Sequence, residues 1–157
     1  MNYTSDIVDK YPEVDVIPIP FTDYGGKLGF EGVVETLQVN ADNALVREAL
    51  SRRVDGSVLF VDGGASFKTA LLGGNLATLA ENNGWSGLVI YGCIRDSHEI
   101  KTVNIGCKAL GSTPRKSAKA GSGNVNISLQ VGGITVKPGS YVYCDLDGIV
   151  LASQRLF

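Results

Sequence analysis

The chain has 157 residues, of which 44% are hydrophobic, and a formal net charge of −2. This length and apolar content predict one domain over residues 1–157, and the slightly negative charge excludes the positive field that drives nonspecific binding to nucleic acid. No stretch approaches 18 consecutive apolar residues and no basic segment precedes an apolar run at the N-terminus, so we expect neither a membrane partner nor secretion.

The cysteines indicate a reducing environment. Their number is odd and they are scattered along the chain, at Cys93, Cys107 and Cys144. This pattern is typical of free thiols and not of a disulfide framework. We therefore expect a cytoplasmic protein whose cysteines are small core residues.

The N-terminal part of the chain predicts a helix followed by extended structure. A short helix is expected over residues 5–10. Prolines interrupt residues 12–21, which we expect to be extended or looped because proline blocks helix continuation. Residues 30–39 are rich in Val and Thr and predict a strand.

A helix and a buried strand come next. Residues 41–53 predict a helix with Asp42 as its N-cap. The apolar residues expected to share one face of it are Leu45, Ala49 and Leu50. Residues 57–64 are an apolar run that predicts a buried strand. Residues 67–74 are ambiguous, and a second short strand is one interpretation.

Residues 75–92 complete a predicted β-helix-β unit. The helix covers residues 75–85, with Leu76, Leu79 and Ala80 at helical spacing. Gly84 is a natural C-terminal glycine for this helix. Residues 86–92 then return as a buried strand.

The C-terminal part has the alternating pattern of antiparallel strands. The apolar residues predicted to lie on one face are Val125, Ile127, Leu129 and Val131. Gly132-Gly133 supplies a two-residue hairpin turn, and residues 134–152 continue as three strands joined by turns. The expected fold class is α/β, a mixed sheet with a central β-helix-β unit and an antiparallel C-terminal part.

The β-helix-β unit brings two distant segments together. A helix that connects parallel strands runs antiparallel to them, so its N-terminus lies at the carboxyl edge of the sheet. Gly73-Gly74 opens the predicted helix, and Arg95-Asp96 follows the next strand. We therefore expect these pairs to be neighbours at the edge where open α/β sheets bind ligands.

These residues have the chemistry of a site for an anion and a metal. Amides at a helix N-terminus bind anions, and glycines let a ligand approach closely. Arg95 adds a planar fork for a carboxylate or phosphate. Asp96 would repel an anion unless a cation lay between them, which favours Mg²⁺ or Mn²⁺. A surface ion-pair cluster with Glu99 is the alternative.

Three segments of the sequence carry a family resemblance: VDGGASFKTALLGGNLATLAENNGWSGLVIYGCIRD, LGSTPRKSAKAGSG and VGGITVKPGSYVYCDLDGIVLA. They resemble the family of regulator of ribonuclease activity A (RraA) and the class II 4-hydroxy-4-methyl-2-oxoglutarate aldolases. The aldolase branch is marked by a glycine, twenty intervening residues, Arg-Asp, two more residues and an acid. Gly74, Arg95-Asp96 and Glu99 match this spacing.

The resemblance implies a β/β/α swivelling-domain fold, a homotrimer and a set of site residues. Asp96 would hold the divalent ion, and Arg95 would bind substrate and stabilise negative charge, so that both are catalytic. The backbone contacts to the substrate carboxylate would come from Gly73, Gly74, Asn75 and Leu76. By the same resemblance, Glu99 corresponds to an acid that lies near the metal ion without binding it directly.

The resemblance also implies the reaction. A metal-dependent lyase of this family cleaves 2-keto acids of the 4-hydroxy-4-methyl-2-oxoglutarate type to pyruvate, and the same chemistry would decarboxylate oxaloacetate. The alternative is a noncatalytic regulator that binds and inhibits a ribonuclease or an RNA helicase. Asp96 favours the enzyme, whereas the lack of the acidic C-terminal extension of longer aldolases keeps the regulator open.

Other features receive simpler interpretations. His98 is the sole histidine, and histidine metal sites normally recruit more than one. Lys68 is expected on the surface and not as a Schiff-base former. The basic loop of residues 114–123 is expected to be solvated, with contact to phosphate or a partner as the alternative.

Overall fold

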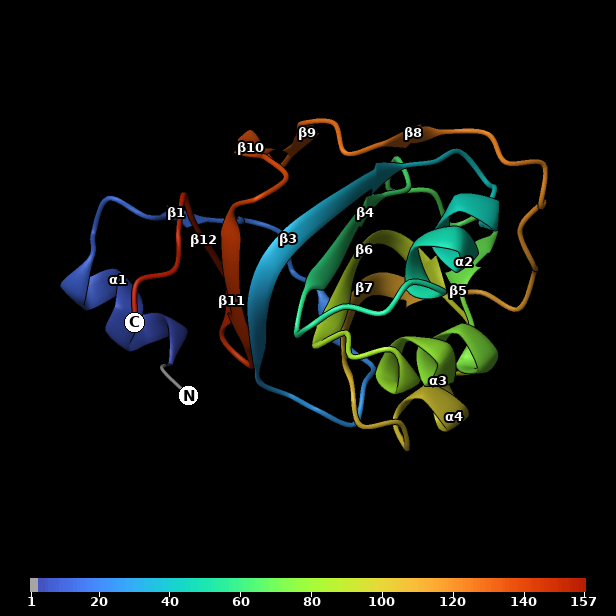
Figure 1. Ribbon diagram of the computed structural model, residues 1–157, viewed down its shortest axis with the longest axis horizontal. Coiled ribbons are helices and arrows are strands. Elements are labelled where there is room, and N and C mark those ends of the chain that lie inside the picture. The colour runs from blue at the N-terminus through green and yellow to red at the C-terminus, as the bar shows by residue number, and fades with distance from the viewer. Residues whose placement is uncertain (1–2) are drawn as a thin grey trace.

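The computed structural model describes residues 3–157 (Figure 1). The helices are α1 (Thr4–Lys10), α2 (Ala44–Leu50), α3 (Gly74–Asn82) and α4 (Ser97–Ile100). The strands are β1 (Asp15–Val16), β2 (Thr22–Asp23), β3 (Phe30–Gln38), β4 (Val58–Asp62), β5 (Ala70–Leu72), β6 (Gly87–Ile94), β7 (Gly106–Ser112), β8 (Asn124–Val125), β9 (Leu129–Val131), β10 (Ile134–Val136), β11 (Tyr141–Asp145) and β12 (Gly148–Ala152). Across residues 3–157 no helix has the length and apolar character that crossing a membrane requires.

Most strands belong to one mixed sheet. Its order is β1-β12-β11-β3-β4-β6-β7-β2, with β5 beside β6 and β8 beside β3. The centre is parallel, from β3 through β4 and β6 to β7, and α3 connects β5 to β6. Strands β11 and β12 pair antiparallel with each other, and β11 pairs antiparallel with β3. This confirms the predicted mixed sheet with a central β-helix-β unit.

Apolar side chains cover both faces of the sheet. Helices α2, α3 and α4 lie together on one side of β4, β6 and β7, whereas α1 lies at the far end beside β11 and β12 (Figure 1). Leu50, Ala77 and Ile100 from the three helices join one core cluster with the sheet. Phe60 and Val89 point to the opposite face and belong to a second cluster. The helices are thereby fixed against the strand ends that form the site.

Several predicted elements are confirmed with small shifts of boundary. Residues 70–72 do form a short strand, which settles the ambiguous segment 67–74. Gly84 has a φ of +87° just beyond α3, as a C-terminal glycine requires. Gly132 and Gly133, with φ of +59° and +79°, form the predicted hairpin turn between β9 and β10.

The start and the buried face of α2 differ from the prediction. The helix begins at Ala44 with Asn43 in the N-cap position, so Asp42 lies one residue before the cap. Leu45 is only half-buried, and Val46 takes its place in the core. The helix has seven residues, and the orientation that buries Val46 and Leu50 leaves Leu45 at the margin of the core.

The prediction that the apolar residues of 124–131 share one buried face is only partly confirmed. Asn126 has a φ of +56°, which ends β8 and breaks the alternation. Val125 is therefore 54% exposed, whereas Leu129 and Val131 are buried. Helix α4 and strand β7 were not predicted from the sequence. Strand β7 contains glycines and the buried Lys108, which hide its apolar pattern.

Candidate active site

The two predicted segments meet at the carboxyl edge of the sheet. The N–H of Gly74, the first residue of α3, donates a hydrogen bond to Asp96 Oδ2 at 3.0 Å. The N–H of Arg95 donates to the carbonyl of Leu72 at 2.9 Å, which ties the end of β6 to the end of β5. The expectation that these segments are neighbours is confirmed.

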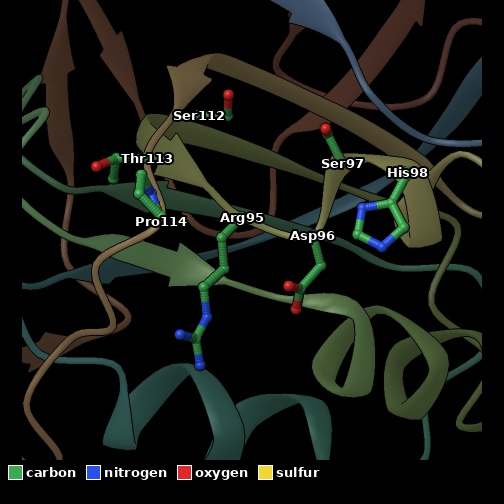
Figure 2. Close-up of a pocket in the computed structure, with 7 residues that line it drawn as sticks. All are labelled: Arg95, Asp96, Ser97, His98, Ser112, Thr113 and Pro114. Atoms are coloured by element: carbon green, nitrogen blue, oxygen red, sulfur yellow. The ribbon is translucent and has the colours of Figure 1, made fainter.

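The backbone of Asp96 directs its carboxylate toward α3. Asp96 has φ 57° and ψ 42°, in the left-handed region, where the chain turns from β6 into α4. Aspartate tolerates this conformation better than most residues that carry a side chain. Figure 2 shows the side chains of Arg95 and Asp96 leaving the strand end on the same side, toward the helices. Asp96 thus combines a strained backbone with a side chain that binds α3.

Two glycines make this approach possible. A Cβ added to Gly73 would lie 2.8 Å from Asp96 Oδ2. A Cβ added to Gly74 would overlap Glu99 Oε2. Both carboxylates therefore lie against the N-terminus of α3, where partial positive charge favours them.

A small pocket of about 120 Å³ opens beside this contact. The predicted site residues that line it are Gly73, Asn75, Leu76, Arg95 and Asp96. The lining also includes residues that were not predicted at the site, among them Asn43, Arg47, Lys116, Ser117 and Lys119. Cationic side chains thus outnumber carboxylates around it, as an anion site requires.

The basic loop is both solvated and part of the pocket. Lys116 and Lys119 are exposed, as expected for residues 114–123, but they also line the pocket. Their clustering was the sequence signal that could have placed them there. Arg47 carried no such signal, because an exposed arginine on a short helix is common. Lys68 is exposed and does not line this pocket, in agreement with its predicted surface position.

A larger hollow of about 350 Å³ lies beside the same two residues. Figure 2 shows the side chains that line it, from the end of β6, from α4 and from the end of β7. They are Arg95, Asp96, Ser97, His98, Ser112, Thr113 and Pro114. His98 Nε2 lies 3.7 Å from Glu99 Oε1, and both side chains are largely exposed. This hollow leaves room for a substrate that extends past Asp96.

The Asp96 carboxylate suits a divalent ion that keeps most of its water. Within residues 3–157, no three His, Cys, Asp or Glu side chains are grouped to hold a metal. Mg²⁺ usually takes one or two protein carboxylates and fills its remaining positions with water and substrate. Oδ2 accepts one hydrogen bond from Gly74, and a carboxylate has about four acceptor sites, so acceptor capacity remains. The residues present therefore fit an Mg²⁺ or Mn²⁺ ion held by Asp96.

Comparison with known proteins gives one family and several activities. The RraA-like (Aldolase/RraA) family matches residues 4–151. A 4-hydroxy-4-methyl-2-oxoglutarate aldolase of Thermus thermophilus is 51% identical over 151 residues, 96% of this chain and 92% of that protein. A putative enzyme of the same name from Alkalilimnicola ehrlichii is 47% identical over 98% of this chain and 96% of that protein.

Two solved structures have the same fold with a TM-score of 0.97. One is the RNA-processing inhibitor RraA from Thermus thermophilus, 48% identical, covering 100% of this chain and 96% of that one. The other is described as an S-adenosylmethionine: 2-dimethylmenaquinone methyltransferase from Geobacillus kaustophilus, 46% identical, covering 99% of this chain and 97% of that one. The names of these relatives thus describe an aldolase, an RNA-processing inhibitor and a methyltransferase.

Proposed function

The chain belongs to the RraA-like (Aldolase/RraA) family, and from that premise we propose that it is a metal-dependent lyase. Its substrates would be 2-keto acids of the 4-hydroxy-4-methyl-2-oxoglutarate type, cleaved to pyruvate, with oxaloacetate decarboxylation as a second reaction. The aldolase names of the relatives support an enzyme role. The proposal includes Mg²⁺ or Mn²⁺ as cofactor, a homotrimeric assembly and a cytoplasmic location.

One observation carries the proposal: a carboxylate is held at the wall of a pocket whose other charged groups are cations. Asp96 is fixed by the N–H of Gly74 and shares the pocket with Arg95 and Arg47. A protein that only bound anions would gain nothing from a carboxylate there, because it repels them. A cation between Asp96 and a keto acid removes that repulsion, so the arrangement favours metal-assisted chemistry.

The pocket offers two places for carboxylates. The amide of Gly74 is engaged by Asp96, so the first-turn amides of Asn75 and Leu76 are left for one substrate carboxylate. 4-Hydroxy-4-methyl-2-oxoglutarate carries a second carboxylate, for which exposed cations line the pocket: Arg47, Lys116 and Lys119. The charge of the pocket therefore suits a dianionic substrate.

Cleavage then needs stabilisation of charge and a proton acceptor. As the bond between C3 and C4 breaks, its electron pair moves toward the keto oxygen, and the hydroxyl on C4 loses its proton. A divalent ion held by Asp96 would act as a Lewis acid and stabilise this charge. Arg95 lines the pocket beside Asp96 and would stabilise the developing negative charge, an effect often worth about 3 to 4 kcal/mol per preorganised donor. Glu99, whose carboxylate lies against Gly74 at the start of α3, would accept the proton through a water molecule.

Pyruvate release tests the proposal. We expect turnover of 4-hydroxy-4-methyl-2-oxoglutarate with Mg²⁺ in a coupled assay, and loss of turnover with EDTA or in Asp96→Ala. Asp9→Ala, an exposed position on α1 at the far end of the molecule, is the matched control and should behave as wild type. Equal rates for Asp96→Ala and wild type would contradict the proposal.

The second candidate is the regulator, because one structure with the same fold is an RNA-processing inhibitor. On that alternative the purified chain would slow a ribonuclease in vitro. Asp96→Ala would not change this inhibition, since the pocket would play no part. The two assays therefore separate the candidates.

A further inference from the structure

We propose that Asp42 is a positioning residue for substrate binding, because its buried carboxylate fastens the basic loop to the start of α2. This loop, residues 114–123, carries Lys116 and Lys119 to the pocket. Asp42 does not line the pocket, so it would act through the lysines. The inference rests on the proposed function, whose substrate is an anion.

The contacts of Asp42 join two segments that are far apart in sequence. Its side chain is 2% exposed. Oδ1 accepts hydrogen bonds from the N–H of Ala44 at 3.0 Å and of Gly121 at 3.3 Å. Oδ2 accepts one from the N–H of Ala120 at 2.7 Å. A single carboxylate thus binds the first residue of α2 and the residues directly after Lys119.

The electrostatics favour the ionised form of this carboxylate. The hydrogen bond from Ala44 lowers the pKa of Asp42, burial opposes it, and the hydrogen bonds from Ala120 and Gly121 lower it further. The net result is a pKa below the usual value, so Asp42 is charged at neutral pH. Hydrogen bonds to an ionised acceptor are about twice as strong as neutral ones. The hydrogen bonds between the Asp42 carboxylate and the loop backbone are therefore stronger than hydrogen bonds between neutral groups.

Other contacts hold the rest of the loop. Its residues belong to no helix and to none of the strands. Backbone bonds from Asn43 to the carbonyl of Ala118 at 3.0 Å, and from Ala118 to that of Ala41 at 2.9 Å, tie it to the same segment as Asp42. The buried Ser117 hydroxyl donates to the carbonyl of Ala70 at 2.7 Å. These contacts hold the middle of the loop, whereas Asp42 holds its end.

Fixing the end of the loop lowers the cost of binding. A free loop and its lysines lose conformational entropy when a ligand orders them. Asp42 orders the backbone beside Lys119 before the ligand arrives, and its bond to Ala44 keeps that backbone in register with Arg47 on α2. Asp42 therefore connects the two cationic walls of the pocket.

The first test is the kinetics of Asp42→Asn. The amide keeps the shape but places an N–H opposite backbone donors, which breaks at least one bond. We expect KM for the dianionic substrate to rise about tenfold, with kcat within about twofold. Asp145→Asn is the matched control, because Asp145 is also buried and binds backbone N–H groups, those of Thr4 and Asp147, away from the pocket. This control should lower stability and leave KM unchanged.

A double-mutant cycle tests whether Asp42 acts through the lysines. In a variant with both Lys116→Ala and Lys119→Ala, Asp42→Asn should raise KM less than about twofold, because both lysines that it positions are gone and only Arg47 remains. A tenfold rise in that background would overturn the proposal, as would an unchanged KM for Asp42→Asn in the wild-type background. If Asp42→Asn does not fold, Asp42→Ser keeps one acceptor for Ala44 and replaces it in both tests.

Calorimetric binding of 2-oxoglutarate, a dicarboxylate probe, separates this inference from the lyase proposal. Weaker binding to Asp42→Asn in a protein without turnover would support the positioning role and reject the lyase. Turnover by the wild type, together with equal binding of the probe by wild type and Asp42→Asn, would support the lyase and overturn the positioning role. A wild-type protein with neither turnover nor binding of the probe would overturn both.

Discussion

Substitution of Gly73 by alanine tests the geometry at the start of α3. The added Cβ would lie 2.8 Å from Asp96 Oδ2, closer than a Cβ approaches other atoms, whereas ordinary contact begins at 3.4 Å. The carboxylate must therefore move by about 0.6 Å, the difference between these distances. A movement of that size away from Gly74 would stretch the 3.0 Å hydrogen bond beyond the usual range.

The expected loss follows from that hydrogen bond. A hydrogen bond to a charged group contributes about 1.5 to 3 kcal/mol, and Asp96 is partly exposed, so the lower figure applies. About 1.4 kcal/mol corresponds to tenfold in an equilibrium constant. We therefore expect kcat/KM for pyruvate formation to fall at least about tenfold, with a higher Mg²⁺ concentration required for half-maximal activity.

The control is another glycine-to-alanine change near the end of β6. At Gly92 the nearest atom to an added Cβ is Leu71 Cδ1, at 3.4 Å, which is an ordinary contact. Gly92→Ala should keep its activity. Thermal unfolding of both variants shows whether either change affects the fold. Wild-type kcat/KM and Mg²⁺ dependence in Gly73→Ala would refute the reasoning about Asp96.

Three further predictions concern stability and reactivity. The three cysteines are buried and free. Burial raises the pKa of Cys107 to about 12, and the negative charge of Asp23 contributes to this rise. A thiol reagent such as DTNB should therefore label no cysteine in the native protein at pH 8, and three after denaturation. Lys108→Ala should lower the free energy of unfolding in urea by about 3 kcal/mol, since it leaves Asp23 without the partner 3.1 Å away; an unchanged midpoint would contradict this. Burial raises the pKa of Asp145, but hydrogen bonds from Thr4, Asp147 and Gly148 together outweigh burial, and the net pKa is lowered. The contribution of Asp145 to stability is present above the unfolded pKa near 3.8 and is lost as pH falls through the folded value, so Asp145→Asn should cost less stability at pH 3 than at pH 7.

The edge of the sheet that carries the candidate site could be predicted from the sequence because it depends on local rules. Helical spacing in residues 75–85 and the apolar run 86–92 predicted a β-helix-β unit. The helix of such a unit runs antiparallel to its two parallel strands, which places the helix N-terminus beside a strand end. The contact between Gly74 and Asp96 follows from that rule. The left-handed backbone conformation of Asp96 could not be predicted in this way, because nothing in the local sequence required it.

Errors arose where tertiary contacts override local preference. Asp42 has the residue type of an N-cap, but its carboxylate also binds the N–H of Ala120, 78 residues later in the chain, and the helix begins one residue further on than predicted. Val125 fits the alternation of a buried face but is exposed, because Asn126 adopts a positive φ. Neither outcome can be predicted from neighbouring residues alone.

The sequence by itself determined the fold class, the residues at the strand end and the family, since these depend on periodicity and on a fixed spacing of glycine, Arg-Asp and acid. Only the tertiary structure decided what surrounds them. Arg47, Lys116 and Lys119 come from a helix and a loop far apart in the chain and share one pocket through the packing of α2 and the bonds of Asp42. The physical reason is that contacts between distant segments depend on backbone hydrogen bonds and core packing, which a local pattern of residues does not specify.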